Sequence, residues 1–327
     1  MLLSRKRKSK FYKFLKFTRL PYLPFTLGID PGNVCNLQCP LCPTGRGDMR
    51  VKRGFMDFGL FKLIFDQLKD SLSVINLYNW GEPLLNRDLI KIIRYIKDAN
   101  KSIQVITSTN LNIKNEGFLG DLVNSGIDKI IVSCDGASKE TYEKYRIGGD
   151  FNLVMENLRF LIKKNKEAGS SALITWNFLV FKHNEHEIES AKKLAGELGV
   201  KLDIGLMRTS LKDEILKPHK EAIEQDREWI PDNPEYSAYD KVSCVTKKIM
   251  NTCKKPWQLI SINWNGLVVP CCAVYEEKYS FGDAKKDSIK SIWNNPKFIL
   301  ARKEILNKKL PAATICGICR NNGFMHM

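Results

Sequence analysis

The chain has 327 residues, of which 43% are hydrophobic, and a formal net charge of +16 at pH 7. This length and apolar content suffice for one large or two moderate cores, which excludes a disordered or fibrous protein. No apolar run reaches the about 18 residues that span a bilayer. Ten cysteines without a recognisable signal peptide favour reduced thiols in a cytoplasmic protein over disulfides.

Residues 1–25 read as a basic, aromatic N-terminal arm. The first twenty positions hold eight Lys or Arg and no acidic residue, interleaved with aromatic residues from Phe11 to Phe17. Such an arm is either solvated or lies on an anionic membrane surface, here the inner face. Nucleic acid is not expected, because no nucleic-acid-binding module follows. The remaining positive charge favours an acidic protein partner, such as an electron-donating flavodoxin or ferredoxin.

Short β-rich runs alternate with helical segments six times between residues 26 and 208. Strands are expected at FTLGID, VINLYNW, IQVITST, KIIVSCD, ALITWNFLVF and VKLDIGLM, with amphipathic helices between them. The alternation predicts an α/β fold with parallel strands and right-handed crossovers, which is a partial (β/α)6 barrel of TIM type. The active site of such a barrel lies at the carboxyl ends of the strands.

Residues 209–250 read as a polar connector rich in turn formers, and a small C-terminal unit is expected over 251–327. This unit begins with a hairpin, WQLISINWNGLVVPCC, in which the pair Asn265-Gly266 favours a tight turn. Short helices are expected next, within SIKSIWNN and PKFILARKEIL, before the chain reaches CGICR.

The stretch GNVCNLQCPLCPTG places Cys35, Cys39 and Cys42 on the loop after the first strand. A disulfide framework needs an even number of cysteines, and a structural zinc site needs four ligands. Three thiolates on a strand-end loop suit an iron–sulfur cube in which one iron is left for a small-molecule ligand. A zinc site completed from elsewhere in the chain is the alternative.

This Cys-x3-Cys-x2-Cys spacing resembles the signature of the radical S-adenosylmethionine (SAM) superfamily. The resemblance implies a 4Fe–4S cluster bound by the three cysteines and by SAM. It also implies SAM-binding residues at the ends of the second, third and fourth strands: Gly81, Glu82, Pro83, Thr109, Asn110, Ser133 and Asp135. Trp80 and Leu111 stand where the family commonly has glycine, and Cys134 is expected in the core.

A second cysteine set lies in the C-terminal unit. The spacing Cys253-x12-Gly266-x4-Cys271 resembles the opening of SPASM and twitch domains, which hold auxiliary 4Fe–4S clusters. Beyond the adjacent Cys272, only Cys316 and Cys319 follow, so the resemblance implies one auxiliary cluster with four protein ligands, the twitch arrangement. A four-cysteine zinc site is the alternative, and Cys272 could replace its neighbour as a ligand. The remaining cysteine, at position 244, is either an exposed thiol or a loop residue near the site.

The resemblance implies an enzyme that reductively cleaves SAM to a 5′-deoxyadenosyl radical and abstracts hydrogen from its substrate. An auxiliary cluster without an open iron favours two-electron oxidation of a sugar, cyclitol or similar metabolite, as in aminocyclitol dehydrogenases. Arg208, just past the sixth strand, is the candidate for assisting deprotonation, although an ordinary surface ion pair is an equal reading. The alternatives are maturation of a ribosomally made peptide and a non-catalytic iron–sulfur electron-transfer or assembly protein. The basic arm also leaves open a lipid-linked substrate.

Overall fold

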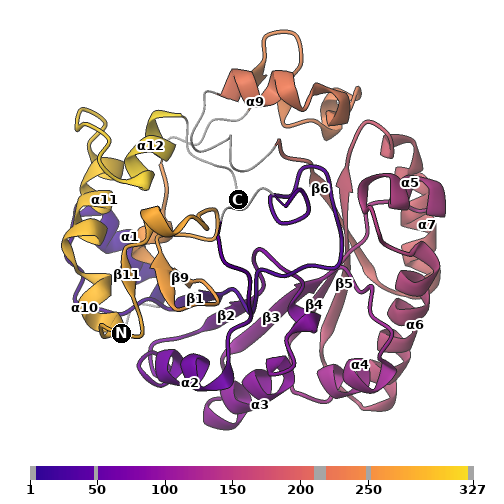
Figure 1. Ribbon diagram of the computed structural model, residues 1–327, viewed down its shortest axis with the longest axis horizontal. Coiled ribbons are helices and arrows are strands. Elements are labelled where there is room, and N and C mark those ends of the chain that lie inside the picture. The colour runs from indigo at the N-terminus through magenta and orange to yellow at the C-terminus, as the bar shows by residue number, and fades with distance from the viewer. Residues whose placement is uncertain (1–4, 48–50, 210–218, 248–251, 323–327) are drawn as a thin grey trace.

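The structure, a computed structural model, describes residues 5–47, 51–209, 219–247 and 252–322. At its centre is a curved sheet in which six parallel strands follow one another in chain order (Figure 1). They are β1 (Thr26–Ile29), β2 (Val74–Leu77), β3 (Gln104–Thr109), β4 (Lys129–Ser133), β5 (Leu173–Val180) and β6 (Lys201–Leu206). Each strand pairs in parallel with the next, so the predicted α/β partial barrel is confirmed.

Helices between the strands cover the outer face of the sheet (Figure 1). They are α2 (Phe58–Asp66), α3 (Leu89–Ala99), α4 (Glu116–Val123), α5 (Lys139–Tyr145), α6 (Phe151–Glu167) and α7 (Ile188–Leu198). Helix α3 shows why they pack there: Leu89, Ile92, Ile93 and Ile96 share one face and are all fully buried. The helices therefore pack on the outer face of the sheet, and loops surround the carboxyl ends of the strands.

The C-terminal hairpin extends the barrel sheet. Strand β9 (Leu259–Ile262) pairs in parallel with β1, in the register Thr26 to Leu259. Strand β10 (Leu267–Val269) returns antiparallel to β9 through a turn at Gly266, whose φ of 88° is left-handed, and β11 (Gly282–Asp283) pairs with β10. The hairpin was expected in a separate unit, but pairing with β1 covers an edge that would otherwise be exposed.

Three helices complete the C-terminal unit: α10 (Ile289–Trp293), α11 (Pro296–Leu306) and α12 (Ile315–Asn321). The fully buried carboxylate of Glu304 accepts hydrogen bonds from the backbone N–H groups of Ala313 and Thr314, just before α12. Arg320, on α12, donates to the carbonyl oxygens of Glu304 and Leu310. These bonds fix the helix that carries the last two cysteines.

The described part of the expected connector, residues 219–247, carries structure of its own. It contains α9 (His219–Gln225) and the short antiparallel pair β7 (Tyr239–Asp240) and β8 (Val245–Thr246). Four of its buried side chains join an apolar cluster with Cys39 and Phe181, and they are Ile223, Ile230, Tyr239 and Cys244. These apolar positions are too widely spaced to show a helical or strand period, so no local pattern indicates that the segment packs beside the cysteine loop.

The N-terminal arm contains a helix, α1 (Arg5–Phe14), which contacts the C-terminal unit. Within the described ranges, no helix combines the length and the apolar character needed to cross a membrane.

Candidate functional site

A pocket with about 170 Å³ of free volume lies at the carboxyl ends of β1 to β4. All three cysteines of the loop after β1 line it. The expected residues that line it with them are Gly81, Glu82, Thr109, Asn110 and Ser133. The fold therefore brings together side chains that are almost a hundred positions apart in the sequence, whereas Pro83 and Asp135 are not among the described residues that line the pocket.

The loop after β2 is fixed directly to the cysteine loop. The backbone N–H of Glu82 donates to the carbonyl oxygen of Val34 at 2.8 Å. A Cβ at Gly81 would collide with the carbonyl oxygens of Gly32 and Val34, so only glycine allows this approach. The buried Glu82 carboxylate accepts from the backbone N–H of Asn110 at 2.7 Å. Its pKa is raised because burial outweighs its hydrogen bonds.

The loop after β3 presents an amide to the cysteines. Nδ2 of Asn110 donates to Oδ1 of Asn36 at 2.9 Å and lies 3.7 Å from Sγ of Cys35. The next residue, Leu111, is fully buried with a left-handed φ of 59°. This conformation is strained for a leucine, which gives a physical reason why the family commonly has glycine here.

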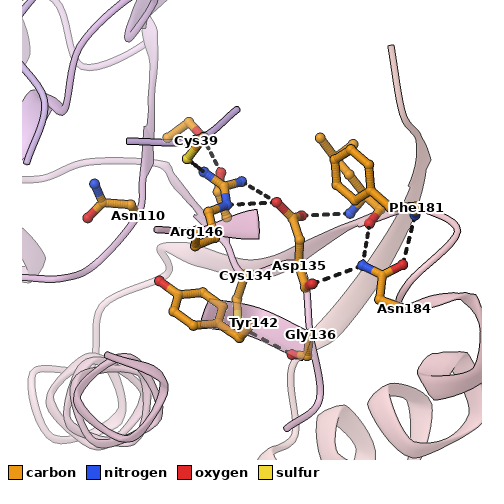
Figure 2. Close-up of polar contacts among 12 residues, drawn as sticks. Cys39, Asn110, Cys134, Asp135, Gly136, Tyr142, Arg146, Phe181 and Asn184 are labelled. Atoms are coloured by element: carbon orange, nitrogen blue, oxygen red, sulfur yellow. Dashed lines mark hydrogen bonds and ion pairs between the residues drawn. The ribbon is translucent and has the colours of Figure 1, made fainter. Parts of the chain in front are cut away.

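Arg146, just after α5, lines the pocket and adds a positive charge to it. Figure 2 shows its guanidinium between Asp135 and Cys39. Its Nη2 and Nε lie 2.6 and 2.7 Å from Oδ2 of the fully buried Asp135. Its Nη1 donates toward Sγ of Cys39 at 3.9 Å. Oδ1 of Asp135 accepts from the backbone N–H of Leu179 at 2.8 Å. Asp135 therefore holds the Arg146 guanidinium beside the cysteine loop. The expected contact of Asp135 with SAM stays a prediction.

The chemistry of this donor set fits an iron–sulfur cluster. Burial raises the pKa of the Cys39 thiol to about 12, although Arg146 opposes the shift. Burial also raises the pKa of Cys35. Bound iron ions would supply further positive charge beside Arg146 and so favour the thiolate form that a cluster needs.

A buried carboxylate, Asp30, ties the end of β1 to the loop after β2. It accepts from the backbone N–H of Trp80 at 3.2 Å and from those of Gly32 and Gly81. Burial nevertheless raises the pKa of Asp30 to about 7. Because the folded chain holds this proton more tightly than the unfolded chain, its contribution to stability should fall as pH rises from about 4 to 7, by at most roughly 4 kcal/mol.

The measurement is the free energy of unfolding of the natural protein and of Asp30→Asn between pH 5 and 8.5. Groups common to both proteins cancel in the difference. We expect the natural protein to lose stability relative to the variant as pH rises toward 7, with no further change above about pH 8. A difference that does not vary with pH would contradict this titration.

The second cysteine set surrounds a smaller cavity of about 40 Å³ in the C-terminal unit. Cys253, Cys271, Cys316 and Cys319 all line it. Burial raises the pKa of the Cys271 thiol to about 12 and that of Cys253 as well. Four half-buried cysteines around one cavity fit a cluster with four protein ligands. Among the described residues, no group of three His, Cys, Asp or Glu side chains is arranged to hold a single metal ion.

A short bridge of residues, formed by Tyr78, Asn79, Cys272 and Lys255, lies between the two cavities. Tyr78 and Asn79 line the first, and the Asn79 amide donates to the carbonyl oxygen of Cys272 at 2.9 Å when its oxygen and nitrogen are assigned to satisfy both contacts. Lys255 lines the second, and its Nζ lies 3.8 Å from Sγ of Cys272. Cys271 thus faces the second cavity, whereas Cys272 faces the bridge.

Other expected residues have distinct places. Arg208 is half-buried and is not among the described residues that line either cavity. It is close enough to Lys255 for charge repulsion to work toward a lower pKa of the Lys255 ammonium. Cys134 is fully buried in the core, as expected. Cys244 is buried beside the cysteine loop rather than exposed.

Sequence reasoning missed Arg146 and Lys255. Each is a single basic residue among 52 Lys and Arg, outside any recognised motif. Only Lys255 had an indirect signal, since it lies two positions after Cys253.

The family comparison agrees with this geometry. The model of the radical SAM superfamily matches residues 29–195, and the model of SPASM, an iron–sulfur cluster-binding domain, matches residues 253–320. The protein belongs to the radical SAM superfamily of enzymes and carries a SPASM region. Membership implies a 4Fe–4S cluster with SAM at the first site and auxiliary iron–sulfur binding at the second.

Two curated relatives show how far sequence similarity extends. A probable GTP 3′,8-cyclase of Methanococcus maripaludis is 31% identical over 55% of this chain, and the match spans only 57% of that protein. The subtilosin biosynthesis protein AlbA of Bacillus subtilis is 25% identical over 88% of this chain and 65% of its own length. The chain thus spans little more than half of the first relative.

Two solved structures share the fold at low sequence identity. BtrN in complex with AdoMet and 2-DOIA is 18% identical, with a TM-score of 0.54 over 88% of both chains. Native anSMEcpe with bound AdoMet is 17% identical, with a TM-score of 0.61 over 92% of this chain and 91% of that one.

Proposed function

We propose that this protein uses a SAM-derived radical to oxidise a sugar, cyclitol or similar carbinol by two electrons. The observation that carries the proposal is that four cysteines of the C-terminal unit line one cavity. A 4Fe–4S cluster with four protein ligands has no iron left for SAM or substrate, so electron transfer is the task that suits it. A single auxiliary cluster is part of this proposal.

When bound, the cofactors supply a carbon radical at the first site and an electron acceptor at the second. Oxidising a carbinol to a ketone then balances as one hydrogen atom to the radical, one proton to a base and one electron to the acceptor. The bridge of Tyr78, Asn79, Cys272 and Lys255 supports this division, because Cys272 contacts both Asn79, which lines the first cavity, and Lys255, which lines the second.

We assign SAM binding to the residues that line or support the first pocket: Gly81, Glu82, Pro83, Thr109, Asn110 and Ser133. Asp135 stays assigned to SAM binding with them, and it also orients the charge of Arg146. Arg208 stays the candidate for assisting deprotonation, and its closeness to Lys255 supports a place between the two cavities. BtrN, which shares the fold, was solved with AdoMet and the small molecule 2-DOIA together, and this favours a small substrate here.

The test begins with iron and sulfide counts on protein reconstituted without oxygen, together with release of 5′-deoxyadenosine from SAM under dithionite. We expect about eight irons per chain, and about four after Cys316→Ala combined with Cys319→Ala. Carbinols deuterated at the reacting carbon should then transfer deuterium into 5′-deoxyadenosine. About four irons in the natural protein would remove the electron acceptor and the argument for dehydrogenation.

Peptide maturation is the second candidate function. AlbA, named for subtilosin biosynthesis, aligns with 88% of this chain, which is the observation that favours it. A precursor peptide encoded beside this gene and modified by the reconstituted protein would reverse our ranking. Full clusters without SAM cleavage would instead favour a non-catalytic electron-transfer or assembly protein.

An acidic flavodoxin or ferredoxin is the proposed electron donor. The net charge of +16 supports attraction to an acidic partner. Such a partnership should weaken as ionic strength rises, because salt screens exposed charges.

A further inference from the structure

The N-terminal helix α1 (Arg5–Phe14) has an inner face that fixes it to the C-terminal unit. Ser9 accepts a hydrogen bond from Nε2 of Gln258 at 2.8 Å, and Nζ of Lys13 donates to Oγ1 of Thr252 at 2.5 Å. The ring of Tyr12 packs on that of Tyr22, with centroids 5.3 Å apart. The helix is therefore held in a defined orientation.

The outer face of the same segment is apolar and uncovered. Phe14 is 82% exposed, and Phe11, Leu15 and Phe17 are each between 46% and 48% exposed. A single exposed apolar side chain needs no explanation, but four within seven positions form a local patch. The other large exposed apolar side chains in the described ranges are spread through the rest of the chain.

Positive charges surround this patch. The exposed basic residues of the segment are Lys6, Arg7, Lys10, Lys16 and Arg19. The first twenty positions contain no acidic residue. Protruding phenylalanines match the apolar boundary of a lipid layer, and the surrounding lysines and arginines match its anionic headgroups.

We propose that this outer face, formed by α1 and the residues up to Arg19, binds the surface of an anionic phospholipid bilayer. Phe11, Phe14 and Leu15 enter the headgroup boundary, while the basic side chains contact lipid phosphates. The inner face then holds the C-terminal unit against the bilayer, since Lys13 contacts Thr252, the neighbour of Cys253. This inference does not depend on the substrate or on the reaction proposed above.

The test is co-sedimentation of the full-length, cluster-loaded protein with vesicles, in low and high salt. One set of vesicles is pure phosphatidylcholine, and the other contains roughly one-third phosphatidylglycerol. We expect binding to the anionic vesicles alone, weakened at least about tenfold by high salt. Phe14→Ser should also weaken it by about tenfold, as should Lys6→Glu combined with Lys10→Glu.

Leu173→Ser is the matched control, because Leu173 is 49% exposed but lies on β5, far from the arm in sequence. It should leave vesicle binding unchanged, and circular dichroism checks that every variant is folded. Absence of binding to anionic vesicles overturns the proposal, and so does equal binding to neutral ones. An effect of Phe14→Ser no larger than that of Leu173→Ser also overturns it. Binding to an acidic protein or to RNA in place of vesicles would assign the face to that partner instead.

Discussion

Replacing Cys39 by alanine is expected to abolish release of 5′-deoxyadenosine from SAM while leaving about half of the bound iron in place. Cys39 lines the first pocket with the other two cysteines of its loop, and the second set lines a separate cavity. Loss of one of three thiolates leaves too few protein ligands for the first cluster, whereas the second keeps all four. The iron count should fall from about eight to about four per chain.

Cys244→Ala is the matched control for this experiment. Cys244 packs in the same apolar cluster as Cys39, but it is not among the described residues that line the pocket. The control should keep both its iron and its SAM cleavage. If Cys39→Ala still cleaved SAM at the natural rate, the assignment of the first site would be wrong.

Replacing Asp135 by alanine should destabilise the protein by about 3–5 kcal/mol. The substitution leaves the Arg146 guanidinium, only 14% exposed, without its carboxylate partner, and removes the acceptor of the Leu179 N–H. A buried charge that loses its partner still carries its desolvation penalty, which the ion pair no longer offsets. The measurement is chemical unfolding followed by circular dichroism without oxygen.

Asp121→Ala provides a comparison at the surface. Asp121 pairs with Arg94 at 2.9 Å, and both side chains are more than half exposed, so its loss should cost under about 1 kcal/mol. Combining Asp135→Leu with Arg146→Met should recover part of the stability, because the pair is then replaced by apolar groups. Equal costs for the two aspartates would show that burial does not set the strength of the inner pair.

Local sequence patterns were sufficient to predict most of the fold. Apolar runs and alternating helices were sufficient for the six parallel strands, and the Asn265-Gly266 turn was sufficient for the hairpin. The pairing of β9 with β1 was not predictable, because it joins residues from opposite ends of the chain whose register no local pattern encodes. The packing of Ile223 and Tyr239 beside the cysteine loop was missed for the same reason.

The candidate site likewise contains residues that the sequence could predict and residues that it could not. The cysteines could be found because their spacing in the sequence is specific. Gly81 could be found because the backbone of the cysteine loop comes so close that only glycine fits there. Arg146 could not, because its role comes from a contact with Asp135 and a position near Cys39 that exist only after folding. The charge of a pocket is set by such long-range neighbours, so its electrostatics are harder to predict than its ligands.

The pairing of β9 with β1 also bears on how the chain is made. Thr26 and Leu259 are partners in one sheet, yet the ribosome adds the second long after the first. At 5–20 residues per second, roughly 10 to 50 s of synthesis separate them. During that time the edge of β1 lacks its final neighbour, and the barrel with its cysteine loop is exposed to wrong strand pairing. Synthesis of the C-terminal strand therefore ends a period of vulnerability for the nascent chain.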